Sequence, residues 1–266
     1  MLQTTCMSIS RFHNILNDRK NGSITIALNA LNALREIPEQ SDRKGSLMFN
    51  LMMNKRKEMS ILVNLGRIGI NMINMGYSLH YICDLLIEKL KEDLQKSSIN
   101  ASLATIGCKN FLTISKSEQL LSFFSHLEIN TRVFVLKTYK QPEGSQLISS
   151  ISRMGINCSA INYLQLDKML EEIDCLIVGS DSVMPSAFSN RIGTMYLIAR
   201  MISVGKPSYV LTMSLKISDN KYISLLDSRN FELIPNRLIT KFCTDIGNIG
   251  GKFVYNYLVQ KASLSF

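Results

Sequence analysis

The fold class is indicated most clearly by the stretch Cys175-Leu176-Ile177-Val178-Gly179-Ser180-Asp181. Its apolar residues predict a short buried strand, which Gly-Ser-Asp brings to an end. A polar loop follows, and a helical pattern begins at Asn190-Arg191-Ile192-Gly193-Thr194. In an α/β sheet, ligands bind just outside the carboxyl end of a strand, facing a helix N-terminus. The sequence therefore predicts a pocket here with one carboxylate, Asp181, one cation, Arg191, and several backbone N–H groups.

Apolar runs and helical patterns alternate on both sides of this stretch. Short runs rich in Val, Ile, Leu and Phe predict strands at 110–114, 132–136, 158–161, 175–178 and 208–212. Helical patterns occupy the intervals at 117–124, 144–154, 166–173 and 190–203. Strands separated by helices of this length predict βαβ units and a parallel sheet that is covered on both faces.

The N-terminal part of the chain shows helical periodicity only. Apolar residues recur at helical spacing over 24–34 and 79–94. The Met-rich segment 48–75 also predicts helix, interrupted by its glycines, with methionines that fill the core. The predicted fold class is α/β, with an all-helical N-terminal domain and a Rossmann-like parallel-sheet C-terminal domain. We place these domains at residues 1–105 and 106–266.

Composition narrows the functional class. The 266 residues are 46% hydrophobic and 19% charged, which is enough apolar material for well-formed cores. The formal net charge is +9, but Lys and Arg do not cluster as a nucleic-acid footprint requires, so we expect no direct nucleic-acid binding. Lys55-Arg56-Lys57 is the one basic run, and we interpret it as solvated surface or as a contact for an acidic partner.

The absence of recognisable targeting signals and the spacing of the cysteines favour a cytoplasmic protein. No N-terminal apolar leader and no run of about 18 apolar residues is present, so we expect no membrane association. The cysteines are scattered, without the spacing of a metal site or a disulfide framework, and we expect reduced thiols, no metal and no cofactor. They are Cys6, Cys83, Cys108, Cys158, Cys175 and Cys243.

Motifs in four parts of the chain share their order and spacing with one family. They are Asp18-Arg19-Lys20-Asn21-Gly22-Ser23, Pro142-Glu143-Gly144, Gly179-Ser180-Asp181 with Asn190-Arg191-Ile192-Gly193-Thr194, and Phe231-Glu232-Leu233-Ile234-Pro235 with Thr244-Asp245-Ile246-Gly247. The chain resembles the family of the translation initiation factor 2B alpha, beta and delta subunits. That family also contains sugar-phosphate isomerases that act on ribose 1,5-bisphosphate and 5-methylthioribose 1-phosphate.

The resemblance leaves catalysis open because the family holds both enzymes and non-catalytic subunits. It implies that the isomerases pair a cysteine, at the carboxyl end of the first sheet strand, with the aspartate of their G-A-D motif as acid and base. Asp181 matches the aspartate, whereas Ser115 stands in the place of the cysteine. A serine hydroxyl does not ionise near pH 8.5 as a thiol does, and no histidine is close in sequence to activate it. We expect Asp181 to be catalytic only if the protein is an enzyme.

The other cysteines do not replace the missing thiol. Three of them begin predicted strands and so belong to the opposite edge of the sheet from a site at the carboxyl ends. Cys243 falls in the C-terminal helical pattern, and the remaining two lie in the helical domain. We interpret all of them as core or surface thiols.

Anion binding follows from the same resemblance. Helix starts with nearby cations suit a phosphate, and the predicted ligand-binding residues are Arg19, Gly22, Ser23, Ser115, Ser117, Gly179, Asp181, Asn190 and Arg191. An arginine of the enzymes is replaced by Tyr139, which cannot bind phosphate bidentately. For the Arg19-x-x-Gly22-Ser23 motif, simple helix capping by Ser23 is the alternative.

Two functional hypotheses remain. The favoured one is a non-catalytic protein similar to the initiation factor 2B subunits, which acts by self-association or by association with related subunits and binds a phosphorylated sugar or nucleotide. The alternative is an intramolecular aldose–ketose isomerase that uses Asp181 with an altered partner.

Overall fold

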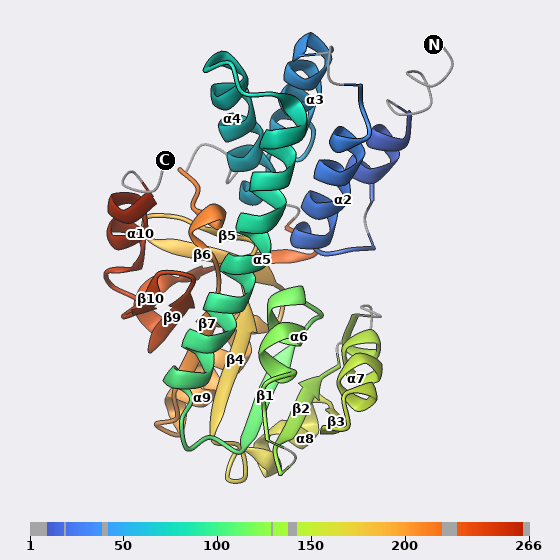
Figure 1. The fold of residues 1–266 in the computed structure, drawn as a ribbon. Coiled ribbons are helices and arrows are strands. Elements are labelled where there is room, and N and C mark those ends of the chain that lie inside the picture. The colour runs from blue at the N-terminus through green and yellow to red at the C-terminus, as the bar shows by residue number, and fades with distance from the viewer. Residues whose placement is uncertain are drawn as a thin grey trace. The chain divides into compact units, whose positions relative to one another are not determined.

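A computed structural model describes residues 10–18, 20–38, 42–128, 130–137, 143–219 and 228–262 (Figure 1). The chain forms two compact units, residues 1–92 and 93–266, and the boundary lies inside the long helix α5, Leu79–Ala104. The first unit is helical and the second is α/β with a mostly parallel sheet, which confirms the fold class expected from the sequence.

The helical unit contains α2, α3 and α4 ahead of α5. These helices span Ser23–Arg35, Asp42–Lys55 and Ser60–Asn74. The Met-rich segment thus forms two helices. We expected its glycines to interrupt the helix, but α4 continues through Gly66 and Gly69. A methyl group on Gly69 would lie 2.5 Å from the ring of Phe49, and one on Gly66 would lie 2.7 Å from the Phe49 carbonyl oxygen. These glycines therefore allow α3 and α4 to pack closely.

A mostly parallel sheet forms the centre of the second unit. Among the described residues its strand order is β10-β9-β7-β4-β1-β2-β3, and every neighbouring pair is parallel except β9 with β10. The strands are β1 Asn110–Ile114, β2 Arg132–Leu136, β3 Asn157–Ile161, β4 Cys175–Gly179, β7 Ser208–Leu211, β9 Lys241–Thr244 and β10 Gly247–Ile249. β1, β2, β3, β4 and β7 confirm the strands predicted from apolar runs.

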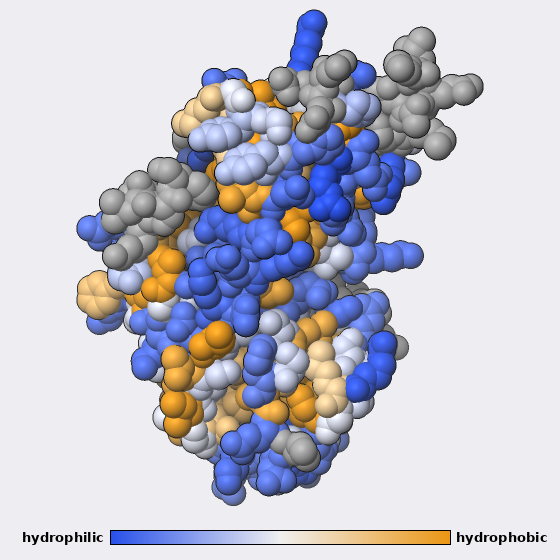
Figure 2. Space-filling view, in the orientation of Figure 1, coloured by the Kyte–Doolittle hydropathy of each residue, from blue (hydrophilic) through white to orange (hydrophobic). Residues whose placement is uncertain are grey.

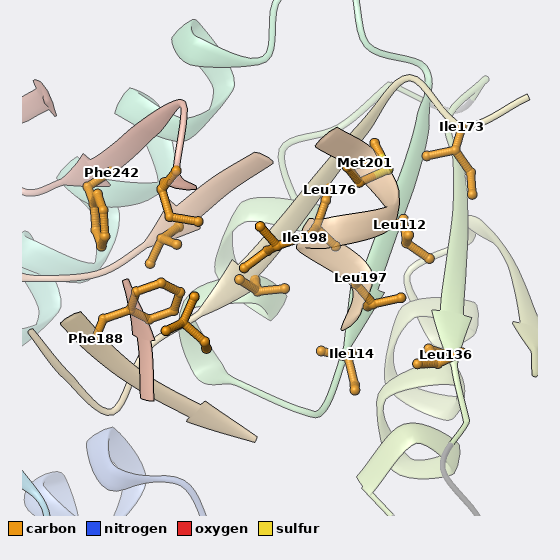
Figure 3. Close-up of a cluster of buried hydrophobic side chains, with 14 of the residues drawn as sticks. Leu112, Ile114, Leu136, Ile173, Leu176, Phe188, Leu197, Ile198, Met201 and Phe242 are labelled. Carbon is orange, nitrogen blue, oxygen red and sulfur yellow. The ribbon is translucent and has the colours of Figure 1, made fainter. Parts of the chain in front are cut away.

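Helices cover both faces of this sheet because its strands are apolar on both sides. The C-terminal part of α5, α6 (Glu118–Phe124) and α7 (Glu143–Arg153) pack on one face, where Phe111, Val133 and Ile177 are buried. The other face is covered by α8 (Tyr163–Met169), α9 (Thr194–Ser203) and α10 (Val254–Ala262). Figure 3 shows this second core, in which Leu197, Ile198 and Met201 of α9 lie over Leu112 and Leu176.

A small antiparallel sheet corrects one helix prediction. β5 (Ser182–Val183), β6 (Ala187–Arg191) and β8 (Phe231–Pro235) pair in that order. Asn190 and Arg191 therefore lie on a strand, and α9 begins only at Thr194, after Gly193 with a φ of 102°. The pairing partner of β6 comes about forty residues later in the chain, so helical periodicity alone could not reveal this strand.

Cys243 was also assigned wrongly by periodicity. It lies on β9, paired in parallel with β7, and not in a C-terminal helix. The helix of the C-terminal region, α10, starts later, at Val254. A four-residue strand inside an otherwise mixed segment gives too few residues for a reliable period.

The strand order contains one reversal point. From β1 the chain moves outward through β2 to β3, then returns to place β4 on the other side of β1. Ligands of open α/β sheets bind at such a point, in the crevice beyond the carboxyl ends of the strands. For this unit the point lies between the carboxyl ends of β1 and β4.

We predict that Gly251→Ala destabilises the second unit. A methyl group there would overlap the carbonyl oxygen of Asn236 and lie 2.7 Å from that of Ile239, both of which are backbone atoms. We expect a loss of about 1–3 kcal/mol of unfolding free energy, measured by urea denaturation. Gly250→Ala is the matched control, because its nearest neighbour would be the Phe253 ring at 3.9 Å. Equal stability of the two variants would contradict the prediction.

Candidate functional site at the carboxyl ends of β1 and β4

The residues after β1 and β4 approach one another closely. Ser115 follows β1, is buried, and has a φ of 62°, which is uncommon for a residue with a side chain. Ser117 is the N-cap residue of α6. A methyl group on Gly179 would lie 3.1 Å from the Ser117 hydroxyl oxygen. The structure therefore brings Ser117 and Gly179 together at the reversal point, as a shared site requires.

Lys216 is a candidate site residue that sequence analysis missed. It belongs to the 3-10 helix η1, Ser214–Lys216, that follows β7, and only 2% of its surface is exposed. Its Nζ donates to Gln119 Oε1 at 2.8 Å and to the carbonyl oxygen of Ser180 at 2.6 Å. Its charge also interacts with that of Asp181. A buried amine therefore stands beside the predicted carboxylate.

The surroundings of Lys216 set its protonation. Burial lowers the pKa of this amine to about 8, while the Asp181 carboxylate acts in the opposite direction. The two acceptors bonded to Nζ are uncharged oxygens, so they satisfy two of its three donors without neutralising it. Lys216 can consequently change its protonation state near neutral pH, which an exposed lysine does not do.

Hydrogen bonds between loops hold Lys216 in place. The Asp245 carboxylate, after β9, accepts from the backbone N and the hydroxyl of Ser214, each at 2.6 Å. The Ser180 hydroxyl donates to Thr212 Oγ1 at 2.7 Å, which joins the ends of β4 and β7. The Ser180–Thr212 bond is buried, so water does not compete with it effectively, and the Asp245 bonds are partly buried. The position of Lys216 is therefore fixed by segments that follow β4, β7 and β9, and not by a single loop.

Asp181 connects this edge to the small sheet. Its backbone N–H donates to the carbonyl oxygen of Ser189 at 2.9 Å, on β6. Asn190, which follows Ser189 on β6, is 3% exposed. Among the described residues its Nδ2 has no hydrogen-bond partner. A buried donor without a partner costs free energy. Such a donor is one that a ligand oxygen can satisfy.

The start of α9 is less open to an anion than the sequence suggested. Glu232 on β8 accepts from the backbone N–H of Met195 at 2.8 Å, so a carboxylate of the protein already occupies part of this helix N-terminus. The guanidinium of Arg191 lies over the ring of Phe231, 4.4 Å from its centroid. Arg191 is thus oriented by stacking on Phe231, and it belongs to β6 and not to the helix.

The remaining predicted anion-binding residues belong to the helical unit. Asp18 accepts from the backbone N–H groups of Lys20 and Asn21, at 2.7 and 3.2 Å, and so shapes the loop before α2. Gly22 is the N-cap residue of α2 and provides no side-chain cap. Ser23 is the first helical residue and is buried, so the alternative that Ser23 caps this helix is wrong. Arg19 lies outside the described residues.

The basic run Lys55-Arg56-Lys57 is not simply solvated. The side chain of Arg56 is 11% exposed, and it donates to the carbonyl oxygens of Leu16 and Asp18, at 3.2 and 2.7 Å. It also pairs with Glu58. Arg56 therefore holds the segment that leads into the Asp18 loop.

Three of the described cysteines lie near the amino edge of the sheet, whereas Cys243 is level with Leu211 and therefore with Gly179, near the carboxyl ends of the strands. Cys158 and Cys175 are at or near the first residues of β3 and β4, and Cys108 precedes β1. Cys6 and Tyr139 lie outside the described residues. Among the residues that the structure describes, no group of three or more His, Cys, Asp or Glu could hold a metal ion. In the same part of the chain, no helix is both long and apolar enough to cross a membrane.

One family model matches most of this chain, and solved structures share its fold. The model of the initiation factor 2 subunit family matches residues 19–228, and no curated protein sequence matches. The structure is similar to the translation initiation factor eIF-2B of Pyrococcus horikoshii OT3, at 17% identity and a TM-score of 0.77, over 92% of this chain and 97% of that one.

Two further solved structures share the fold. One is the tetrameric eIF2B-beta2-delta2 complex of Chaetomium thermophilum, at 13% identity and a TM-score of 0.73, over 96% of this chain and 94% of that one. The other is the 5-methylthioribose 1-phosphate isomerase of P. horikoshii OT3, at 17% identity and a TM-score of 0.69, over 96% and 88%. Subunits and an enzyme thus share this fold, and at these identities the likeness shows the fold alone.

We predict a pH-dependent stability that originates in Lys216. The unfolded chain keeps the ordinary lysine pKa of 10.5, so between about pH 8 and 10.5 it binds more protons than the folded protein. The contribution of this group to stability therefore rises with pH across that window, by about 3 kcal/mol in full. Below pH 8 both states are protonated and the cost of burying the charge is constant.

Urea denaturation of the wild type and of Lys216→Met from pH 7 to 10 measures this effect. The difference in unfolding free energy between them should shift in favour of the wild type as pH rises. Lys206→Met, which removes an amine bonded to the carbonyl oxygens of Leu170 and Glu171, controls for the loss of a lysine. A pH-independent difference for Lys216→Met would show that this amine does not titrate as stated.

Proposed function

We propose that this chain, which belongs to the initiation factor 2 subunit family, is a subunit-like protein that binds a phosphorylated sugar or nucleotide without converting it. It acts through association with copies of itself or with related subunits. The ligand occupies the crevice between the carboxyl ends of β1 and β4, and its phosphate is bound by Lys216 and Asn190.

The buried amine of Lys216 is the observation that carries this proposal. A charged group away from water interacts strongly with an anion, because little solvent screens the attraction. Two oxygen acceptors fix the amine in position before any ligand arrives, so little entropy is lost on binding. The unpartnered Nδ2 of Asn190 adds a donor that a phosphate oxygen can satisfy.

The position of Ser115 favours binding over catalysis. It follows β1, where the resemblance places the cysteine of the isomerases. A hydroxyl with an ordinary high pKa does not exchange protons at neutral pH, so Ser115 supplies a hydrogen bond and no acid or base. Asp181 would then orient hydroxyl groups of the ligand.

A second candidate is supported by the same lysine. With a pKa of about 8 and a carboxylate beside it, Lys216 could replace the missing thiol as the partner of Asp181. Aldose–ketose conversion moves a proton between two adjacent carbons, which needs one group to remove it and another to protonate the carbonyl oxygen. In this candidate the protein is a sugar-phosphate isomerase with an Asp181–Lys216 pair.

A combined binding and turnover assay separates the two candidates. We expect ribose 1,5-bisphosphate or a nucleoside monophosphate to raise the Tm of the wild type with no product formed. Lys216→Met and Asn190→Ala should each weaken binding by about 10- to 100-fold, the usual effect of losing a hydrogen bond to a charged group. Affinity should also fall as pH rises above about 8, because Lys216 loses its charge.

Asp167→Asn is the control, because this exposed residue of α8 pairs with Arg200 on the surface. If the wild type forms product and both Asp181→Asn and Lys216→Met form none, the protein is an isomerase and the proposal of binding alone is wrong. Unchanged affinity in Lys216→Met would remove Lys216 from the site.

Self-association is supported by exposed apolar side chains of the second unit. Ile99 and Leu103 lie one turn apart on α5 and are 47% and 58% exposed, and Ile106, two residues after the helix, is 78% exposed. Figure 2 shows apolar surface along the C-terminal end of α5. Exposed apolar patches of this kind are typical of interfaces.

Light scattering tests the association. We expect a particle of at least twice the 30.0 kDa chain mass, and a shift toward monomer in Leu103→Asp. Phe253→Asp changes an apolar residue outside this stripe that is 68% exposed, and it should leave the mass unaltered. A monomeric wild type at micromolar concentration would contradict the association.

A further inference from the structure

A buried amide, Gln119 on α6, links the candidate site to α5. Its side chain is fully buried. Its Oε1 accepts from Lys216 Nζ at 2.8 Å, and its Nε2 donates to the hydroxyl oxygen of Ser97 at 3.5 Å. Ser97 lies on α5 and is fully buried as well. Both ends of the amide therefore have a partner, as a buried polar side chain requires.

The partners of Gln119 determine which way its amide points. An ammonium group donates hydrogen bonds and accepts none, so the oxygen of Gln119 has to face Lys216. At the other end, the Ser97 hydroxyl donates to the carbonyl oxygen of Leu94 at 2.9 Å, which leaves the Ser97 oxygen to accept from the amide. The reversed amide would turn its N–H groups toward the ammonium and lose both hydrogen bonds. The orientation of Gln119 thus follows from the chemistry of its two neighbours.

Lys216 is held from both sides of the crevice. Gln119 belongs to α6, which follows β1, and Ser180 directly follows β4. The two acceptors of Nζ, at 2.8 and 2.6 Å, therefore come from the segments after the two strands that flank the reversal point. An amine bonded to both segments keeps one position, so its side chain loses conformational freedom when the protein folds and not when a ligand binds.

The amide holds this amine without adding a charge of its own. Asp181 is the charged group that acts on Lys216. On the other elements near η1, Asp245 is bonded to η1 itself, Tyr257 of α10 donates to a backbone carbonyl oxygen, and Glu118 of α6 is partly exposed. One ammonium and one carboxylate balance each other. A glutamate in place of the amide would make this group negative, which disfavours an anion.

We propose that Gln119 is a positioning residue of the candidate site, which holds the Lys216 ammonium at the crevice without compensating its charge. Gln119 acts through Lys216 and does not touch the ligand. Its use in phosphate binding rests on the proposed function, whereas its hold on Lys216 is a property of the protein alone and is tested without a ligand.

A pH titration of Lys216 followed by NMR tests the proposal. We label the ε-carbons of lysine isotopically and identify the Lys216 signal by its absence in Lys216→Met. Burial lowers the wild-type pKa of this amine to about 8. Gln119→Met keeps the size of the side chain and removes the acceptor, which disfavours the ammonium and should lower the pKa by about 1. Gln119→Glu places a carboxylate against the ammonium and should raise the pKa by about 1 or more.

Opposite changes of the pKa identify the positioning role, because a loss of packing does not move the pKa in both directions. An unchanged pKa in Gln119→Met, or a change in the same direction in both variants, would overturn the proposal. Should Gln119→Glu fail to fold, as judged by circular dichroism, Gln119→Met and the serine variants of α5 decide.

Two serines of α5 provide a matched pair for this purpose. Ser97 and Ser98 are both fully buried, and both donate to the same carbonyl oxygen at 2.9 Å. Ser97 accepts from Gln119, whereas Ser98 is bonded to a serine of α6. Ser97→Ala should lower the pKa of Lys216, by less than Gln119→Met does, and Ser98→Ala should leave it unchanged. An effect of Ser98→Ala as large as that of Gln119→Met would overturn the proposal.

Phosphate binding separates this inference from the proposed function. With ribose 1,5-bisphosphate at pH 7, Gln119→Met and Gln119→Glu should each weaken binding by about 10-fold. The first leaves the amine less fixed and less charged, and the second adds a carboxylate that repels the anion. If the wild type binds no phosphate while the pKa of Lys216 changes as expected, the proposed function is wrong and the hold of Gln119 on Lys216 stands. If both variants bind as tightly as the wild type, Gln119 is not a positioning residue.

Discussion

The parallel pairing of β1 with β4 is the constraint on which the second unit depends. Phe111 pairs with Cys175 and Leu112 with Leu176, and this contact joins the two halves of the sheet. Both strands are buried on both faces, so a shift of register by one residue would exchange the side chains of the two cores. The fixed register is what places the loop after β1 and the loop after β4 at a common height. Without it, Ser117 and Gly179 would not meet.

Burying Lys216 at that point is costly, and the surrounding structure offsets the cost. An amine moved out of water loses solvation worth several kcal/mol unless it is paired and hydrogen-bonded. Gln119 and Ser180 supply two acceptors, and Asp181 supplies the opposite charge. Removing Gln119 would leave one N–H donor of Lys216 without its acceptor. A buried titratable group that costs stability in this way is typical of a functional site.

Sequence periodicity was enough for β1, β2, β3, β4 and β7, because buried parallel strands are continuous apolar runs, but it missed β9 and β10 of the same sheet. It failed for β6, where Asn190 and Arg191 are polar and pair with residues distant in sequence. It also failed for Lys216, because nothing in the local pattern of Ser214–Lys216 shows that the chain turns inward there. The motif placed Asp181 at the carboxyl edge of the sheet, where the structure has it. Lys216 lies beside Asp181 only because β7 pairs with β4 in the sheet, which the sequence alone does not show. Contacts that depend on topology are what a linear pattern cannot contain.

The protonation of Lys216 connects the two candidate functions physically. An ammonium group binds phosphate, whereas a neutral amine can remove a proton from carbon. A phosphate placed against the amine favours the charged form and raises its pKa, which reverses the effect of burial. Binding a phosphate at Lys216 thus disables this residue as a base at neutral pH. Catalysis would require the ligand to place its phosphate elsewhere and its reacting carbons beside Lys216, whereas binding needs only the arrangement in which anion and cation meet.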